Sequence, residues 1–89
     1  MLVWEVEFDA QAEDDLASLN TALRSRVIEK ITWLKVNFDV VTPLPLTADW
    51  YGFYKLRIGD WRVIYDIDWE QRIITIVLIG HHTKVYKHL

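Results

Sequence analysis

The most constraining feature of the sequence is a Gly-Asp pair between two strand-like segments. Gly59 and Asp60 separate residues 53–58, in which apolar side chains alternate with polar ones, from the strand-like residues 61–67. Two such segments joined by two residues form a β-hairpin, in which the glycine supplies the positive φ angle of a tight turn. The sequence therefore predicts an antiparallel strand pair with a fixed register.

This register places three basic side chains on one face of the hairpin. A two-residue loop pairs Arg57 directly with Arg62, and Lys55 lies two residues from Arg57 on the same face. Like charges opposite each other in a sheet cost stability, which favours an anion between them. Arginine binds phosphate through paired hydrogen bonds and lysine adds a point charge, so a phosphate site is one interpretation. The alternatives are a solvated face or neutralisation by a carboxylate, for which the candidates are Asp49, Asp66 and Asp68.

A strand and two helices are predicted ahead of the hairpin. Apolar and acidic side chains alternate over residues 3–8, as in a strand with one buried face. Asp9 is a suitable N-cap for a helix over residues 10–19, and a second helix over residues 21–37 carries an apolar stripe at helical spacing. The two helices could pack as a helical hairpin or both lie on a sheet.

A loop and a last strand complete the expected fold. Pro43 and Pro45 exclude a helix and a central strand, so residues 39–52 are predicted to form a loop with an extended bias. Residues 72–79 are almost entirely apolar, which indicates a central strand covered on both faces, and Gly80 is expected to end it. The expected fold class is α+β in the order β-α-α-β-β-β, with two N-terminal helices packed on a small antiparallel-rich sheet.

Length and composition restrict the class of protein. The chain has 89 residues, enough for a single domain over residues 1–89. Hydrophobic residues make up 52% of it and charged residues 26%, a globular balance that excludes disordered and collagen-like classes. The absence of cysteine excludes disulfides and thiolate chemistry and fits a reducing cytoplasm. No signal peptide or membrane span is apparent, so we expect a cytoplasmic protein without membrane contact.

Charge is distributed unevenly along the chain. The net charge is −3, yet residues 71–89 hold three basic residues, three histidines and no acid. Residues 1–15, in contrast, hold six acids and no base. Net charge therefore does not indicate a nucleic-acid-binding protein, but a local basic face toward the C-terminus remains possible.

A second group of polar residues follows the last predicted strand. Residues 80–86 read Gly-His-His-Thr-Lys-Val-Tyr. Histidine can act as a general acid or base near neutral pH, and tyrosine can stack on a nucleobase or hold a proton. The alternative is a surface loop whose tyrosine closes one end of the core. No spacing of His, Asp, Glu or Cys matches a metal site, so no metal is expected.

Three stretches of the sequence resemble one known family. They are residues 43–47, 52–65 and 79–86, and the most specific part is the Leu-Arg-Ile-Gly-Asp-Trp-Arg-Val-Ile-Tyr run within the second. Together they resemble the RelE/ParE superfamily of type II toxin–antitoxin toxins, most closely its RelE branch, over essentially the whole chain. The resemblance implies a RelE-like fold. It also implies a ribosome-dependent mRNA endonuclease, or mRNA interferase, that needs no metal or other cofactor.

The resemblance also implies a mechanism and a site. In this family the ribose 2′-hydroxyl attacks the adjacent phosphate on the concave face of the sheet. Such a reaction needs a base, cations for the developing charge and an acid for the leaving oxygen. Transferred position by position, the implied catalytic residues are Lys55, Arg57, Arg62, His82 and Tyr86, and the implied substrate-binding residues are His81 and Lys84.

The sequence departs from the family pattern at two positions. His82 stands where many relatives carry arginine, and Phe53 stands where some carry a further lysine. His82 could replace the arginine as a general acid, or the change could mark a weakened enzyme. Two alternative functions therefore stay open: a ParE-like inhibitor of DNA gyrase, and a catalytically weakened toxin that acts as an antitoxin-binding co-repressor.

The resemblance implies macromolecular partners. They are the ribosome with its mRNA and a cognate antitoxin, a separate small protein whose C-terminal segment wraps the toxin. Helix faces that carry Leu19, Leu23 or Trp33 are candidate antitoxin contacts, although we expect each of these residues to pack in the core.

Overall fold

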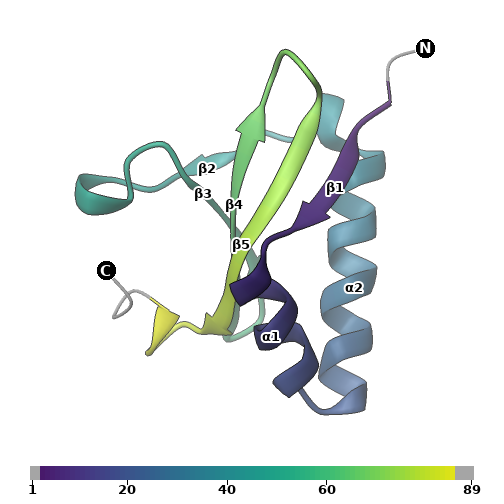
Figure 1. Ribbon diagram of the computed structural model, residues 1–89, viewed down its shortest axis with the longest axis vertical. Coiled ribbons are helices and arrows are strands. Elements are labelled where there is room, and N and C mark those ends of the chain that lie inside the picture. The colour runs from purple at the N-terminus through teal and green to yellow at the C-terminus, as the bar shows by residue number, and fades with distance from the viewer. Residues whose placement is uncertain (1–2, 86–89) are drawn as a thin grey trace.

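The computed structural model describes residues 3–85 of the chain. Its elements follow in the order β1 (Glu5–Phe8), α1 (Ala10–Ser18), α2 (Thr21–Val36), the 3-10 turn η1 (Phe38–Val40), β2 (Leu44–Pro45), the 3-10 turn η2 (Ala48–Trp50), β3 (Tyr54–Ile58), β4 (Trp61–Asp68) and β5 (Ile73–His81). The five strands form one sheet in the order β1-β5-β4-β3-β2, with both helices on the same side (Figure 1). The predicted α+β fold is thus confirmed.

Side-chain caps begin both helices, and the cap at Asp9 was predicted from the sequence. The Asp9 carboxylate accepts a hydrogen bond from Ala12 N at 2.9 Å, and the Asn20 side chain accepts one from Leu23 N at 2.9 Å. The Arg24 guanidinium donates to three backbone carbonyls in and just after the last turn of α1. These bonds satisfy backbone groups that helix ends leave open. Both helices lie on the sheet instead of forming a separate helical hairpin.

The central hairpin has the predicted register. Gly59 adopts a φ of +58°, and Arg57 lies opposite Arg62. The prediction missed β2, a two-residue strand in the expected loop that pairs Pro45 with Tyr54. Proline is tolerated there because an edge strand needs no hydrogen bond on its outer side. The sheet is mixed, since β1 runs parallel to β5 while the other pairs are antiparallel.

A β-bulge in β5 changes which side chains face the helices. Ile76 lies opposite Tyr65 and Leu78 lies opposite Ile64, so Val77 is an extra residue on β5. An extra residue shifts the two-residue alternation by one position. Residues after the bulge therefore point to the face opposite to the one that uninterrupted alternation would give them.

β5 also ends later than predicted. Gly80 was expected to end the strand, but β5 continues through His81, which pairs with Trp61 at the start of β4. β5 lies between β1 and β4, so it is an internal strand, as predicted. It is not covered on both faces throughout, because Ile73 and Thr75 are only half-buried.

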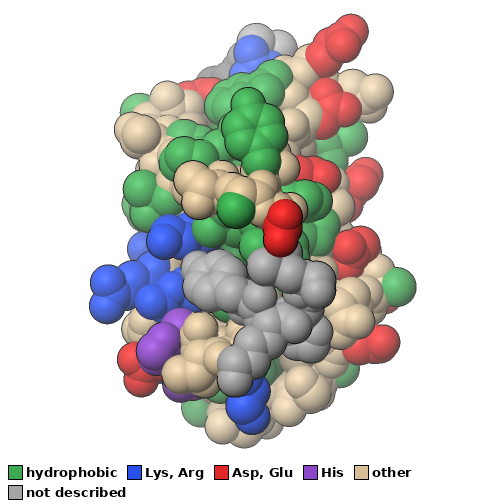
Figure 2. All heavy atoms as spheres, turned by 90° about the vertical axis from the view of Figure 1, so that its left-hand side faces the viewer, with side chains coloured by type: hydrophobic (Ala, Val, Ile, Leu, Met, Phe, Trp, Pro, Cys, Tyr) green, Lys and Arg blue, Asp and Glu red, His purple; other side chains and the backbone are tan. Residues whose placement is uncertain are grey.

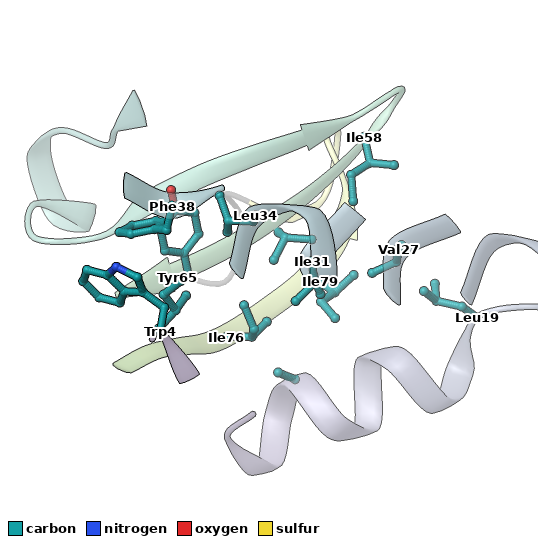
Figure 3. Close-up of a cluster of buried hydrophobic side chains, with 13 residues drawn as sticks. Trp4, Leu19, Val27, Ile31, Leu34, Phe38, Ile58, Tyr65, Ile76 and Ile79 are labelled. Atoms are coloured by element: carbon teal, nitrogen blue, oxygen red, sulfur yellow. The ribbon is translucent and has the colours of Figure 1, made fainter. Parts of the chain in front are cut away.

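Two apolar clusters stabilise the fold. The larger one fills the space between the helices and the sheet, and its fully buried members include Val27, Leu34, Tyr65, Ile74 and Ile76 (Figure 3). Burial raises the pKa of Tyr65 to about 12, with a smaller contribution from Tyr54. The smaller cluster lies on the other face of the sheet and consists of Leu46, Ile64, Leu78 and Val85.

The tryptophans are not all where the sequence placed them. Trp61 packs against the larger cluster, but Trp33 is 45% exposed and the prediction of core packing is wrong for it. Trp33 directly precedes the buried Leu34, and neighbouring helical residues point about 100° apart, so it falls beside the buried stripe.

No helix within residues 3–85 is long and apolar enough to cross a membrane.

Candidate functional site

The candidate site lies on the face of the sheet that the helices leave uncovered, here called the open face. Lys55 and Arg57 of β3 and Arg62 of β4 share this face, as the register requires. Figure 2 shows Lys and Arg side chains gathered there beside histidine. Within residues 3–85 no carboxylate oxygen lies within 4.0 Å of these three cations. Asp49, Asp66 and Asp68 therefore form no ion pair with these three cations within residues 3–85.

Arg62 is held in place by the hairpin turn itself. Its Nη1 donates to the carbonyls of Gly59 and Trp61, both at 2.9 Å. A guanidinium has three nitrogens, so Nε and Nη2 can still donate to a phosphate. Arg57, directly opposite, is exposed. The pair thus combines a fixed cation with an exposed one.

The turn after β5 joins the same end of the sheet. His82 N donates to the carbonyl of Asp60 at 2.8 Å, which ties this turn to the hairpin turn. Val85 is 1% exposed and packs against Ile64 and Leu78 on the open face. His82 and Lys84 are exposed on the turn. Tyr86 lies outside the described residues.

His81 lies on the other face of the sheet. Its ring meets the edge of Trp61 with ring centroids 5.6 Å apart, on the side of the helices. Its Nδ1 lies 2.8 Å from Thr83 Oγ1 and accepts a hydrogen bond from Thr83 N at 3.3 Å. The bulge at Val77 explains this placement, since uninterrupted alternation would have put His81 beside Arg62. His81 therefore lies on the face of the sheet opposite to Lys55, Arg57 and Arg62.

Sequence reasoning missed two residues that position this site. The Asp15 carboxylate of α1 accepts a hydrogen bond from Ile79 N at 2.9 Å, beyond the point where β1 stops pairing with β5. Val85 packs the turn after β5 against the open face.

The unbroken apolar run over residues 76–79 was the available signal for a bulge, because a regular strand with one polar face alternates.

The opposite end of the open face is acidic. A hollow of about 700 Å³ there is lined by residues that include Glu7, Asp66, Asp68, Glu70 and Thr75. Burial raises the pKa of Asp66, the nearby Asp68 and Asp9 add to this, and a hydrogen bond from Thr75 opposes it. The open face thus has a basic end at the hairpin turn and an acidic end four residues further along β4.

Solved structures with the same fold are toxins of toxin–antitoxin systems. The RelBE2 toxin–antitoxin complex from Mycobacterium tuberculosis contains a chain that matches at 27% identity and a TM-score of 0.80, covering 90% of this chain and 99% of that one. The archaeal RelE–RelB complex from Pyrococcus horikoshii matches at 27% identity and a TM-score of 0.71, covering 94% and 100%. The isolated Escherichia coli RelE toxin, at 15% identity and a TM-score of 0.72 over 88% and 83%, supports the fold alone.

The shared fold and the family match thus define a small α+β toxin of the RelE/ParE superfamily. A search of the curated proteins found no match to the sequence. Residues 6–86 match the family model described as ParE toxin of type II toxin–antitoxin system, parDE, so the chain belongs to this family of toxins.

Proposed function

We propose that this toxin is a ribosome-dependent endonuclease that cleaves mRNA. The observation that carries the proposal is the Arg57–Arg62 pair with Lys55 beside it, on an open face where no described carboxylate neutralises them. Such a cluster is costly in the free protein and is favourable only when an anion binds. A phosphodiester is the anion that matches two guanidiniums and an ammonium.

The proposed reaction is attack of a ribose 2′-hydroxyl on the adjacent phosphate. As the 2′-oxygen bonds to phosphorus, its proton passes to solvent; the bond from phosphorus to the 5′-oxygen breaks, and a 2′,3′-cyclic phosphate remains. Arg57 and Arg62 hold the phosphate and stabilise the charge that develops on its oxygens. Lys55, two residues from Arg57 on the same face, adds a third positive charge that stabilises the same oxygens. His82, exposed on the adjoining turn, serves as general acid for the leaving 5′-oxygen. Tyr86, which directly follows Val85, stacks on a base. This chemistry requires no cofactor.

The turn after β5 has a supporting role in this proposal. Lys84 contributes a cation that attracts the RNA backbone. In this proposal His81 can reach the substrate only at the end of β5. There the centroid of its ring lies 4.6 Å from the centroid of the His82 ring. Its contact with Thr83 makes it a positioning residue for the turn in the described geometry.

The partners follow from the same proposal. The toxin acts on mRNA at the ribosome, which places it in the cytoplasm, and a cognate antitoxin neutralises it. The similar chains from M. tuberculosis and P. horikoshii were both solved in complexes with antitoxins, which supports an antitoxin partner here.

The test is induced expression of the wild-type chain beside Arg62→Ala, with growth and primer extension on a reporter message. We expect growth arrest with cuts inside translated codons, both lost in Arg62→Ala. Lys35→Ala, which removes a distant cation on α2, should keep both. Arg62→Lys separates loss of charge from loss of the turn bonds. Arrest of wild-type cells without cut messages would contradict the proposal.

A second candidate is inhibition of DNA gyrase. It is favoured by the family model, which describes a ParE toxin. A supercoiling assay with purified gyrase tests it directly, and inhibition without message cleavage would assign this function. If folded protein neither arrests growth nor inhibits gyrase, the weakened toxin that acts as a co-repressor is the conclusion, and His82→Arg is the variant expected to restore cleavage.

A further inference from the structure

A pair of aromatic side chains lies on the open face, next to the basic site. Trp50 of η2 and Phe53, which directly precedes β3, meet edge to face with their ring centroids 5.5 Å apart. Both side chains are half-buried and pack against the smaller apolar cluster, which places them on the open face. The segment between β2 and β3 that carries them projects from the sheet on the side away from α2 (Figure 1). We call this pair the aromatic platform.

The platform continues the row of cations along β3. Phe53, Lys55 and Arg57 follow one another at intervals of two residues, so their side chains share the open face. Leu46 N donates to the Phe53 carbonyl at 2.9 Å, which extends the strand pairing as far as Phe53. At a rise of about 3.3 Å per residue, Phe53 lies about 7 Å from Lys55 and about 13 Å from Arg57 along the strand. The Phe53 ring is therefore within reach of a base whose nucleotide is held by these cations.

The segment that carries the platform has two features that cost folding free energy. Ala48, the first residue of η2, adopts a φ of +53°, a left-handed conformation that side chains disfavour. The Trp50 Nε1 is buried and has no hydrogen-bond partner among the described residues. Covering the apolar cluster requires neither feature. Strained backbone and unsatisfied buried donors gather instead at functional segments.

The charge on either side of the platform favours an uncharged ligand group. Gly52, which directly precedes Phe53, lines the acidic hollow together with Glu7 and Asp66. The phosphates of an RNA strand are attracted at Lys55 and repelled at the acidic end. The group that contacts the platform between them is therefore the uncharged part of a nucleotide. Nucleobases are flat and uncharged, and they stack on aromatic side chains.

We infer that the aromatic platform is a nucleobase site, which stacks one base of the RNA while Lys55 and Arg57 hold the adjoining backbone. The inference rests on the proposed function for its RNA substrate, and it adds a base contact separate from that of Tyr86. Phe53 is nearer the cations, so its ring stacks on the base, and Trp50 supports that ring from the side. A purine fits the platform better than a pyrimidine, because its larger ring system stacks more strongly.

The test compares RNA strands with and without the stacked base. The ligand is a fluorescent trinucleotide in which every ribose carries a 2′-O-methyl group, so that its 2′-oxygens cannot attack the phosphates. In three further strands one base at a time is replaced by an abasic residue. The affinity of each strand for the wild-type chain and for Phe53→Leu is measured by fluorescence anisotropy at about 0.01 M salt, where phosphate contacts bind most strongly.

The expected result is a loss of affinity that depends on one base. Phe53→Leu should weaken binding of the complete strand about tenfold, as for the loss of one stacked base. It should leave the affinity of one of the abasic strands unchanged, because that strand has no base to stack. Equal losses for the complete strand and for every abasic strand would overturn the inference. An unchanged affinity of Phe53→Leu, or no binding by the wild-type chain, would overturn it as well.

Matched variants control for charge and for the fold. Arg57→Ala removes a phosphate contact and should weaken the complete and the abasic strands alike. Trp33→Leu removes an aromatic side chain that is 45% exposed on α2, outside the open face, and should change none of the affinities. Leucine keeps the apolar contact of Phe53 with the smaller cluster, so Phe53→Leu should fold, as thermal unfolding will report. A base-dependent loss in Trp33→Leu as large as that in Phe53→Leu would contradict the assignment.

The outcomes separate this inference from the proposed function. Message cleavage by the wild-type chain is measured in a translating extract. If messages are cut but the loss in Phe53→Leu does not depend on a base, the platform is wrong and the cleavage stands. If no message is cut but the loss depends on a base, the cleavage is wrong and the platform stands. If Phe53→Leu weakens binding of the purified antitoxin and leaves RNA binding unchanged, the pair contacts protein and the inference is wrong.

Discussion

Replacing Arg57 by glutamine is expected to stabilise the free toxin. Arg57 and Arg62 lie directly opposite each other on neighbouring antiparallel strands, and within residues 3–85 no carboxylate lies within 4.0 Å of either. Residues paired in this way have Cα atoms only about 5 Å apart. In the absence of a bound anion the two guanidiniums therefore repel each other.

The size of the gain follows from the geometry. Two unit charges about 7 Å apart repel by about 0.6 kcal/mol in bulk water. Arg57 is exposed, so solvent keeps the value near this limit, and measured cross-strand charge effects fall at about 0.2–1 kcal/mol. A gain of about 0.5 kcal/mol corresponds to a rise of about 2–4 °C in the Tm of a domain of this size.

The assay is thermal unfolding at low and high salt. The gain of Arg57→Gln should be largest at low ionic strength and should nearly vanish at about 1 M salt, where the screening length is about 3 Å. Arg57→Lys is the matched control, because it keeps the charge and should show no gain. Inorganic phosphate should raise the Tm of the wild-type chain more than that of Arg57→Gln. A gain that persists at 1 M salt, or a lower Tm for Arg57→Gln, would refute the repulsion between the arginines.

Three further predictions concern residues around the site and the core, each tested by urea unfolding. Burial raises the pKa of Asp66, so the folded state favours the protonated carboxyl and loses stability as pH rises through that pKa. Asp66→Asn should therefore be more stable than the wild-type chain at pH 7 and equal to it near pH 3. Asp15→Ala removes the acceptor for Ile79 N and should cost about 1–2 kcal/mol, whereas Asp14→Ala, at an exposed neighbour, should cost little. Val27→Ala deletes a fully buried side chain and should cost about 2 kcal/mol; a smaller effect than that of Asp14→Ala would contradict the assignment of Val27 to the core.

Features set by residues near one another in sequence could be predicted from the sequence. The register of the hairpin depends on two turn residues, and the helix starts depend on Asp9 and Asn20, whose side chains cap backbone groups three residues away. The shared face of Lys55, Arg57 and Arg62 follows from that register alone. The charged half of the site was therefore accessible without a structure.

Features set by distant partners were not accessible in the same way. β2 is a strand only because Pro45 meets Tyr54, and β5 extends past Gly80 only because His81 meets Trp61. The bulge at Val77 decides the face of His81, and nothing in the local sequence fixes the residue at which a bulge forms. Pairs between residues far apart in sequence depend on the whole sheet. The positions of His81 and His82 therefore could not be predicted without the structure.

The division of the open face explains how a chain with a net charge of −3 can present a cationic site. Arg62 and Asp66 lie on the same strand face, four residues apart, which is about 13 Å along β4. The screening length at physiological salt is about 8 Å, so the acidic end acts only weakly on the basic end there. At about 0.01 M salt the screening length is about 30 Å and the two ends act on each other. The affinity of the basic end for phosphate is therefore governed by its local cations, and the net charge of the chain is a poor guide to it.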